Sequence, residues 1–534
     1  MVGRSQRRLL VAALALAVAS ASASFPSRAQ AQTPTSATPT PTSPTPATSP
    51  PSAVPAAPAP QTLSSTLDGV MAGLPETSCL TVRIDGRAVY RNRADLPLLP
   101  ASTQKLITSA VSLDVLGADH RFTTRVRASF APVDGVVVGD LFLVGGGDPL
   151  LATNTSRFIR RIGDDQHPTS LETLADRVAA AGIRRVTGRV VGDESRYDQE
   201  RTVRTWPARY AAQGQSGPLS ALTVDDGYHY DLPPDADPIR RRDDRPALSA
   251  AATFTTLLQE RGIEIGAFPG EGKAPPTAPE ITHIRSAPLK SILAELLTFS
   301  DNQTAELLLK EIGLRVGGAG TTAAGAAAVA ARSNSLGIST PGSVVVDGSG
   351  LDRGNRTTCD QLVAVLEGSG PDGTIGRGLA VAGRTGTLRH RLEVPELAGR
   401  LRAKTGNLPD VTALAGFVPT ATGEIATFAM ITNGQPDTNV TWFAQTAVGE
   451  AIAHHRVVCD SSPKVPLVLP GAIYAGSMGT LAAFPLETVV IAGTSVPVSL
   501  LATERAAIVD RCLAADDDFE ILLGSHLAPS GIDG

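Results

Sequence analysis

The sequence predicts an α/β (α+β) protein, in which an antiparallel sheet is flanked by helices and interrupted by a large, mostly β insertion. Residues 79–90 alternate apolar and polar side chains around Asp85-Gly86, as a β-hairpin does. Between residues 121 and 284, many short strand-like runs alternate with turns. Three further strands, separated by tight turns, precede a helix predicted at 440–453 and are expected at residues 401–404, 411–418 and 425–432.

The N-terminus carries the features of a secretory signal peptide. Arg4, Arg7 and Arg8 precede a short apolar run at 9–23, and Ala29-Gln30-Ala31 follows as a small-residue cleavage site. We expect residues 1–31 to be removed after Ala31, which leaves a secreted protein of the cell envelope with no membrane span. The alternative is a membrane anchor, but the apolar run is shorter than the roughly 20 residues that a span requires.

Residues 32–61 form a Pro/Thr/Ser/Ala-rich stretch, in which no apolar core can form. We expect a disordered linker there. Two interpretations stay open: a spacer that reaches into the cell wall, and an inert segment.

Helices are predicted where apolar residues recur at helical spacing. Pro100 opens the first helix, in which Leu106, Ala110 and Leu113 share a face, and Gly117 ends it. Three more helices are expected at residues 289–299, 303–313 and 321–336.

These elements divide the chain into domains. One domain is expected over residues 62–125 and 285–458, with the mostly β insertion at 126–284 between its two halves. A linker at 459–479 and a separate segment at 480–534 follow.

Composition excludes several classes of function. The 534 residues include 47 Lys and Arg against 52 Asp and Glu, a net charge of −5, which gives no electrostatic reason for a nucleic-acid partner. The 8 His residues are scattered without metal-ligand spacing, so neither a metal nor another cofactor is expected. The 4 cysteines allow three complete disulfide pairings, and the sequence does not choose among them.

Three short motifs carry the chemistry, in the order Ser102-Thr103-Gln104-Lys105, Ser300-Asp301-Asn302 and Lys404-Thr405-Gly406. The set S-x-x-K, S-D-N and K-T-G is typical of penicillin-binding proteins and class A β-lactamases. Each motif alone is weak evidence, because Ser461-Ser462-Pro463-Lys464 also fits the first and Arg384-Thr385-Gly386 nearly fits the third. We interpret the former as a chance match and the latter as structural or supporting.

Ser102 and Lys105 are the predicted nucleophile and base. They are separated by three positions on one helix, so their side chains share a face. A serine hydroxyl needs a base within hydrogen-bond reach, and a lysine can act as one only when burial and neighbouring charges lower its pKa.

The other two motifs supply groups around the nucleophile. Ser300 is expected to relay a proton to the leaving amine, and Asn302 to bind both Lys105 and the substrate amide. Lys404, on an edge strand, and Thr405 are expected to bind the terminal carboxylate of a peptide.

Backbone groups are expected to contribute as well. Gly406 would let the substrate backbone approach closely. The N–H groups of Ser102 and Asn407 are the candidate oxyanion hole.

With these motifs, the chain resembles the D-alanyl-D-alanine carboxypeptidase/endopeptidase family of low-molecular-mass class C penicillin-binding proteins, peptidase family S13, over residues 63–458. Besides the motifs, the matching segments are Leu99-Pro100-Ala101-Ser102, Gly139-Asp140-Leu141 through Gly147-Asp148-Pro149, Pro218-Leu219-Ser220-Ala221-Leu222, Asp347-Gly348-Ser349-Gly350-Leu351 and Gly386-Thr387-Leu388. The resemblance implies a penicillin-binding/β-lactamase-like transpeptidase domain with inserted domains. It also implies that peptidoglycan stem peptides are substrates and that β-lactams are inhibitors.

Two features depart from this family pattern. Asn407 stands where the family usually has a small hydroxyl residue. Residues 480–534 instead resemble the N-terminal substrate-binding domain of Lon-type proteases, cut short after about a quarter of its length.

The expected function is therefore a serine-type D-Ala-D-Ala carboxypeptidase, a DD-endopeptidase, or both, acting through an acyl-enzyme at Ser102. Two alternatives remain: a β-lactamase or esterase on the same scaffold, and a non-catalytic wall-binding protein. The balance between the two peptidase activities, the preferred stem peptide and the oligomeric state are left open.

Overall fold

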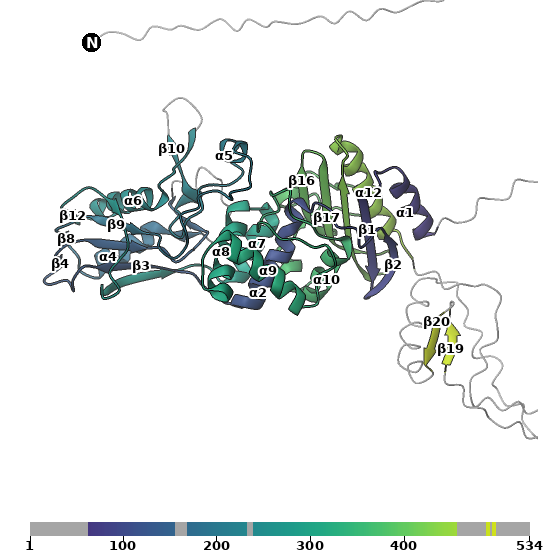
Figure 1. The fold of residues 1–534 in the computed structure, drawn as a ribbon, viewed down its shortest axis with the longest axis horizontal. Coiled ribbons are helices and arrows are strands. Elements are labelled where there is room, and N and C mark those ends of the chain that lie inside the picture. The colour runs from purple at the N-terminus through teal and green to yellow at the C-terminus, as the bar shows by residue number, and fades with distance from the viewer. Residues whose placement is uncertain (1–61, 155–167, 232–238, 457–487, 492–493, 498–534) are drawn as a thin grey trace, which may run out of the picture. The chain divides into compact units, whose positions relative to one another are not determined.

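The computed structural model describes residues 62–154, 168–231, 239–456, 488–491 and 494–497 (Figure 1). The predicted signal peptide, the whole 32–61 linker, and the decoy motif at Ser461 lie outside these residues. So do Cys459 and Cys512.

A six-stranded antiparallel sheet forms the centre of the fold, in the order β15-β16-β17-β18-β1-β2. Its strands are β1 (Ser78–Ile84), β2 (Arg87–Asn92), β15 (Ala380–Val381), β16 (Arg402–Leu408), β17 (Val411–Pro419) and β18 (Ile425–Asn433). The predicted hairpin and the three predicted C-terminal strands thus belong to one sheet. Because β1 pairs with β18, the two ends of the domain are joined.

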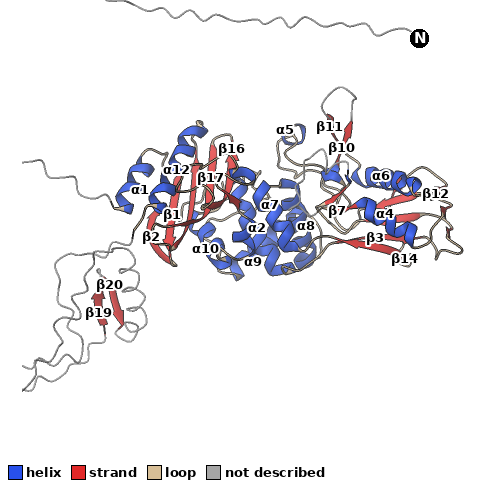
Figure 2. Ribbon diagram, turned by 180° about the vertical axis from the view of Figure 1, so that it is seen from behind, coloured by secondary structure: helices blue, strands red, loops and turns tan. Residues whose placement is uncertain are grey.

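Helices cover both faces of this sheet (Figure 2). On one face lie α1 (Leu63–Ala72) and α12 (Thr438–Ala453). On the other face, α10 (Cys359–Ser369) lies against β1, β17 and β18. The core on this face also includes α2 (Gln104–Leu116), α7 (Leu289–Phe299), α8 (Asn302–Gly317), α9 (Thr322–Ser335) and α11 (Thr374–Gly378). The predicted helices are confirmed, whereas α1, α10 and α11 were not expected.

Strand β17 shows why the sheet is buried on both faces. Its Ala413 and Ala415 pack with the helices of one face, while Leu414 and Val418 pack with α1 and α12. Side chains alternate across a strand, so a continuous apolar run is required when both faces are covered.

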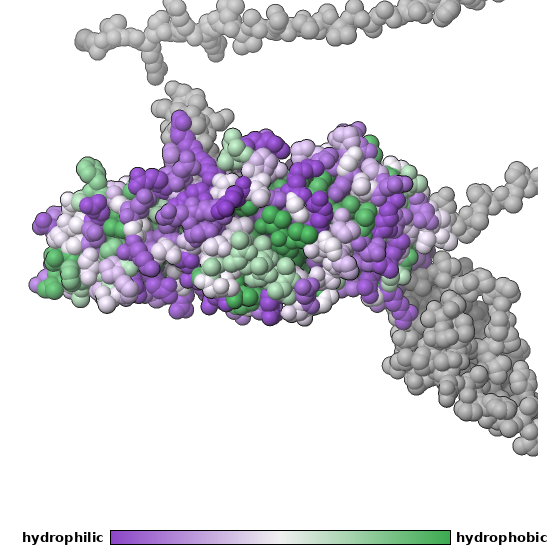
Figure 3. All heavy atoms as spheres, viewed as in Figure 1, coloured by the Kyte–Doolittle hydropathy of each residue, from purple (hydrophilic) through white to green (hydrophobic). Residues whose placement is uncertain are grey.

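The Ala-rich helix α9 packs closely on α8. A Cβ atom added to Gly325 would lie 2.2 Å from the carbonyl oxygen of Leu309. In Figure 3, apolar side chains gather on the surface around α9. Small residues on α9 let the two helices approach closely. This packing fixes the position of α8, whose first residue is Asn302.

The inserted segment leaves and rejoins the domain through paired antiparallel strands, β3 (Thr123–Ala128) and β14 (Glu280–Arg285). They belong to a five-stranded sheet in the order β13-β9-β5-β3-β14, with β5 (Leu141–Val144), β9 (Val190–Asp193) and β13 (Gly270–Glu271). A second sheet is all parallel and contains β4 (Val136–Val137), β8 (Arg185–Val186) and β12 (Glu264–Ile265).

The insertion contains more helix than expected. Along the chain, α4 (Leu171–Ala180) lies between the parallel partners β5 and β9, and α6 (Pro246–Glu260) lies between the parallel partners β9 and β13. Parallel neighbours cannot be joined without such a crossover. The apolar side chains of α4 are fully buried at helical spacing, a signal that the sequence carries: Leu171, Leu174, Ala175 and Val178. The division into domains at 126 and 284 stays a prediction.

The remaining elements of the insertion are short. They are β6 (Leu151–Ala152), β7 (Thr169–Ser170), α5 (Arg209–Ala212), η2 (Asp225–Gly227), β10 (Tyr228–Asp231) and β11 (Ile239–Arg242). Trp206, Tyr210 and Leu219 pack against Leu307 of α8 and Leu351, so this part of the insertion reaches the sheet domain. Residues 488–491 and 494–497 form a separate hairpin, β19–β20; the likeness to Lon proteases stays a prediction.

A disulfide joins Cys79 on β1 to Cys359 at the start of α10. Both cysteines are fully buried. The bond links the first strand of the sheet to a helix 280 positions later in the chain.

Candidate active site

The predicted nucleophile lies at the start of α2, on the short 3-10 helix η1 (Ala101–Thr103). The Nζ atom of Lys105 is 3.0 Å from the Oγ atom of Ser102. The preceding residue, Ala101, adopts a left-handed conformation with φ of 46°, and its carbonyl lies against Gly350. This turn therefore holds Ser102 between α2 and the 347–350 loop.

Lys105 is fully buried and has three acceptors. Besides Ser102, it donates to Oδ1 of Asn302 at 2.7 Å and to the carbonyl of Ser349 at 2.7 Å. Burial lowers the pKa of Lys105 to about 8, against the opposing effects of Asp347, Glu306 and Asp301. A lysine with this pKa is partly neutral near physiological pH, as a general base must be.

Two buried acids near Lys105 were missed by the sequence analysis. Glu306, one turn after Asn302 on α8, accepts from the N–H groups of Gly348 at 3.1 Å and Ser349 at 2.8 Å. Burial raises the pKa of Glu306. An acid within the apolar run of this helix was the available sequence signal.

Asp347 is the second acid. It accepts 4 hydrogen bonds, from the side chains of Trp206 and Asn355 and from the N–H groups of Gly350 and Asp352. Burial raises its pKa, and those donors favour the ionised form. The two acids thus hold the loop whose Ser349 carbonyl binds Lys105.

Ser300 and Lys404 form a second pair. Ser300 is the left-handed residue that ends α7, with φ of 63°, and its Oγ atom accepts from Nζ of Lys404 at 2.8 Å. Lys404 also donates to the carbonyl of Thr405 at 2.8 Å. It lies on β16 just beyond Ala403, the last residue that pairs with β15, where the edge of the sheet is open.

Lys404 is fully buried without an anion. Burial, and next the charge of Lys105, hold its pKa well below the usual lysine value. In the described part of the chain, its hydrogen-bond partners are a hydroxyl and a carbonyl. A carboxylate bound here would restore the charged form of this lysine.

The structure gives Gly406 a packing role in addition to the expected one. An added Cβ atom would lie 2.7 Å from the carbonyl oxygen of Pro100 and 3.2 Å from Cβ of Ala101. Gly406 therefore lets the nucleophile turn pack against β16, rather than only admitting a substrate. The next residue, Asn407, is exposed on the same strand.

The inserted segment supplies one wall of the site. Nδ2 of Asn302 donates to the carbonyl of Gln215 at 2.7 Å, so the insertion uses one hydrogen of the amide that was expected to bind substrate. Ser216 and Pro218 hold the neighbouring Gln303 through hydrogen bonds of 2.9 Å and 3.1 Å.

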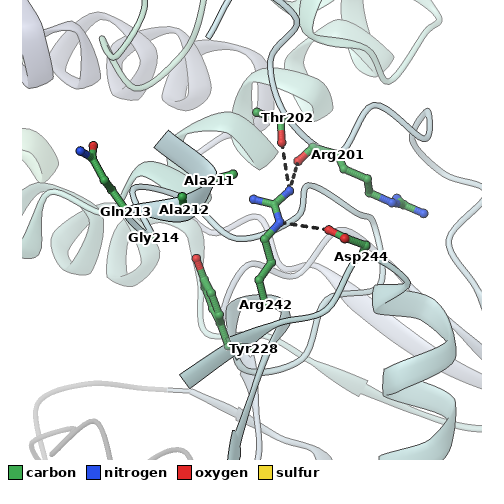
Figure 4. A pocket seen from close by; sticks show the side chains of 9 residues that line it. All are labelled: Arg201, Thr202, Ala211, Ala212, Gln213, Gly214, Tyr228, Arg242 and Asp244. Atoms are coloured by element: carbon green, nitrogen blue, oxygen red, sulfur yellow. Dashed lines mark hydrogen bonds and ion pairs between the residues drawn. The ribbon is translucent and has the colours of Figure 1, made fainter. Parts of the chain in front are cut away.

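A hollow of about 590 Å³ lies behind this wall, between residues 211–214 and the β10–β11 hairpin (Figure 4). Arg242 binds the carbonyl of Arg201, the hydroxyl of Thr202 and the carboxylate of Asp244. Arg242 and Tyr228 also both donate to the carbonyl of Ser216. These contacts anchor the wall that holds Asn302, so the polar side chains of the hollow have a structural task.

The structure therefore brings the predicted residues together in two connected groups. Ser102, Lys105 and Asn302 form one, and Ser300 with Lys404 forms the other. The described residues include no cluster of three or more potential metal ligands. In the same part of the chain, no helix is both long and apolar enough to cross a membrane.

Comparison with known proteins gives the family. The model of the D-Ala-D-Ala carboxypeptidase 3 (S13) family matches residues 77–237 and 231–453. The chain belongs to this family. The resemblance drawn from the three motifs is thereby confirmed, as is the class of serine carboxypeptidase.

Curated relatives and a solved structure agree. The chain is 33% identical over 461 residues to a D-alanyl-D-alanine carboxypeptidase of Actinomadura sp., covering 72% of this chain and 81% of the relative. It is 31% identical to the carboxypeptidase DacB of Mycolicibacterium smegmatis, covering 74% and 86%. The fold matches the crystal structure of penicillin-binding protein 4 from Haemophilus influenzae with a TM-score of 0.62 at 21% identity, covering 73% of this chain and 99% of that one.

Proposed function

We propose that this S13-family protein is a serine-type D-Ala-D-Ala carboxypeptidase that cleaves peptidoglycan stem peptides through an acyl-enzyme at Ser102. The observation that carries the proposal is the pair of buried lysines. One contacts the nucleophile, and the other has no carboxylate partner among the described residues. The names of the relatives point to the same activity.

Acylation begins at Ser102. Neutral Lys105 takes the hydroxyl proton while Oγ attacks the carbonyl carbon of the penultimate D-Ala, which forms a tetrahedral intermediate. The N–H groups of Ser102 and Asn407 are the proposed donors to its oxyanion. The C–N bond then breaks, and Ser300 relays to the departing amine the proton that Lys105 took from Ser102. D-Ala leaves, and Lys105 is neutral again.

Deacylation reverses these proton transfers. Water attacks the ester carbonyl, and its proton passes through Lys105 back to Oγ of Ser102 as the C–O bond breaks. The products are the shortened peptide and the free serine.

Lys404 and Thr405 are the proposed carboxylate-binding residues. The terminal carboxylate of the peptide is the anion that buried Lys404 lacks, and a charge-assisted hydrogen bond in a dry site is strong. Gly406 keeps this strand close to the turn of Ser102. The contact between Gly406 and the turn before Ser102 thus fixes the distance between the carboxylate-binding strand and the nucleophile.

The test is acylation and product release by wild-type protein and by Ser102→Ala. Wild type should form a covalent adduct with a fluorescent penicillin and release D-Ala from a D-Ala-D-Ala peptide; Ser102→Ala should do neither. Ser461→Ala, in the decoy motif, is the matched control and should behave as wild type. Equal labelling of Ser102→Ala would refute the proposal.

The same assay separates the alternatives. Fast turnover of a chromogenic β-lactam without D-Ala release would favour a β-lactamase or esterase. Wall binding without either reaction would favour a non-catalytic protein. Mass analysis of products from purified muropeptides would measure endopeptidase against carboxypeptidase cleavage.

Action on peptidoglycan also implies a place outside the cytoplasm. Residues 1–31 are proposed to act as a signal peptide, with 32–61 as a linker. A fusion of residues 1–61 to a phosphatase that is active only after export should be active. An inactive fusion of normal abundance would contradict this proposal.

A further inference from the structure

A hydroxyl outside the three motifs lies next to the carboxylate-binding strand. Thr387, on the 3-10 helix η3 (Gly386–Leu388), accepts a hydrogen bond of 2.9 Å from the hydroxyl of Thr405. Thr405 is buried, with 3% of its surface exposed, whereas Thr387 is half-buried. A ligand that reaches this strand therefore meets the hydroxyl of Thr387 as well as that of Thr405.

The hydrogen-bond direction matters, because a hydroxyl has a single proton. In this arrangement Thr405 directs its proton to Thr387, so it can donate to a ligand only by giving up that hydrogen bond. The proton of Thr387 has no acceptor in the described part of the chain. Of the two hydroxyls, Thr387 is the one able to donate outward, and the bond from Thr405 polarises it further.

The position of Thr387 is fixed by the backbone before it. Gly386 has φ of 52°, and an added Cβ atom would lie 2.0 Å from the carbonyl oxygen of Thr298. Thr298 belongs to the last turn of α7, just before Ser300. On the other side, Leu388 is fully buried in the core with α1 and α12. The backbone around Thr387 is thus fixed close to Ser300, the residue that accepts a hydrogen bond from Lys404.

We infer that Thr387 is a further substrate-binding residue, whose hydroxyl donates to the terminal carboxylate of the peptide held by Lys404. This inference rests on the proposed function, because it assigns a third group to the same carboxylate. The site would then consist of the ammonium of Lys404 and the linked hydroxyls of Thr405 and Thr387. Such a site favours peptides that end in a free acid.

The test compares two substrates that differ only in that group. An acylated D-Ala-D-Ala peptide is paired with its C-terminal amide, for wild type, Thr387→Val and Thr387→Ser. Thr387→Val should lower kcat/KM on the acid by about ten- to a hundredfold, the usual effect of removing a hydrogen bond to a charged group. Its effect on the amide should stay within about twofold, and Thr387→Ser should restore most of the loss.

The control is Thr256→Val, an exposed threonine of α6 in the insertion, which should leave both rates unchanged. Equal losses of Thr387→Val on acid and amide, or no loss on either, would overturn the inference. If wild type cleaves neither peptide, the proposed function fails instead. Thr387 would then be tested by the acylation rate with a fluorescent penicillin, against a penicillin ester that lacks the free carboxylate; an equal effect on both would again overturn it.

Discussion

Lys105 and Lys404 are equally buried, yet their surroundings differ in charge. Burial lowers the pKa of Lys105, but the nearby buried acids Asp347 and Glu306 oppose this effect, so the pKa stays at about 8. Near Lys404 the charge that matters is Lys105 itself, which lowers its pKa further. In the proposed function, the same residue type therefore serves two purposes: Lys105 gives and takes a proton near neutral pH, and Lys404 binds an anion.

Burial explains why neither task is possible on the surface. An exposed lysine keeps a pKa near 10.4, so it is charged at neutral pH and is not a base. Its interaction with a carboxylate is also weak in water. In the dry interior both properties change, and the neighbouring charges decide which use results.

The largest effect is expected for Lys105→Met. Removing the base should slow acylation by a fluorescent penicillin by about 10²- to 10⁴-fold, the range for a general base. The loss should be the same for substrates with and without a carboxylate, because Lys105 acts on Ser102. Lys464→Met, in the decoy motif, is the control. A loss confined to carboxylate substrates would remove the distinction between the two lysines.

Lys404→Met should have a smaller and more selective effect. We expect kcat/KM on an acid peptide to fall by about ten- to a hundredfold, because a charge-assisted hydrogen bond is lost. Cleavage of the amide should change little. Thermal melting should not fall, since burying the amine of Lys404 without an anion is unfavourable and an apolar side chain of similar length replaces it. A large drop in Tm would contradict the description of Lys404 as unpaired.

The pH dependence of acylation tests the environment of Lys105. The base is neutral above its pKa, so the rate should rise with pH to a plateau above about 8 and fall about tenfold per unit below it. In its ionised form, Glu306 holds up the pKa of Lys105, so the rising limb should move to lower pH in Glu306→Gln. An unchanged limb with a lower plateau would indicate that Glu306 acts only through the 347–350 loop.

The smallest effect on activity is expected from removing the disulfide. Replacing Cys79 and Cys359 by Ala should destabilise the protein by about 2–5 kcal/mol, because the bond closes a long loop. The lysine sites should be unaffected, so acylation of the folded fraction should stay within about twofold of wild type. Chemical denaturation and penicillin labelling measure the two effects separately. A loss of labelling at full folding would show that the bond also shapes the site.

Much of the fold could be predicted from the sequence. The hairpin around Asp85-Gly86 and the apolar strands near the C-terminus predicted the sheet, because short-range patterns define them. Helices α4 and α6 were not predicted, because many short strand-like runs surround them in the insertion. The pairs β5–β9 and β9–β13 are parallel and require crossover helices. Strand pairing joins distant parts of the chain, so only the structure shows it.

The residues of the proposed chemistry were predictable from the sequence alone. Ser102 with Lys105, Ser300 with Asn302, and the Lys404 strand follow from local spacing and order, which folding does not alter. The tertiary structure decided the rest. Only it shows that Glu306 and Asp347 flank Lys105, that Gly406 seats the nucleophile turn, and that Thr387 joins Thr405. Each of these contacts joins residues that lie apart in the chain. The burial that shifts the pKa values of Lys105, Glu306 and Asp347 exists only once those parts are packed.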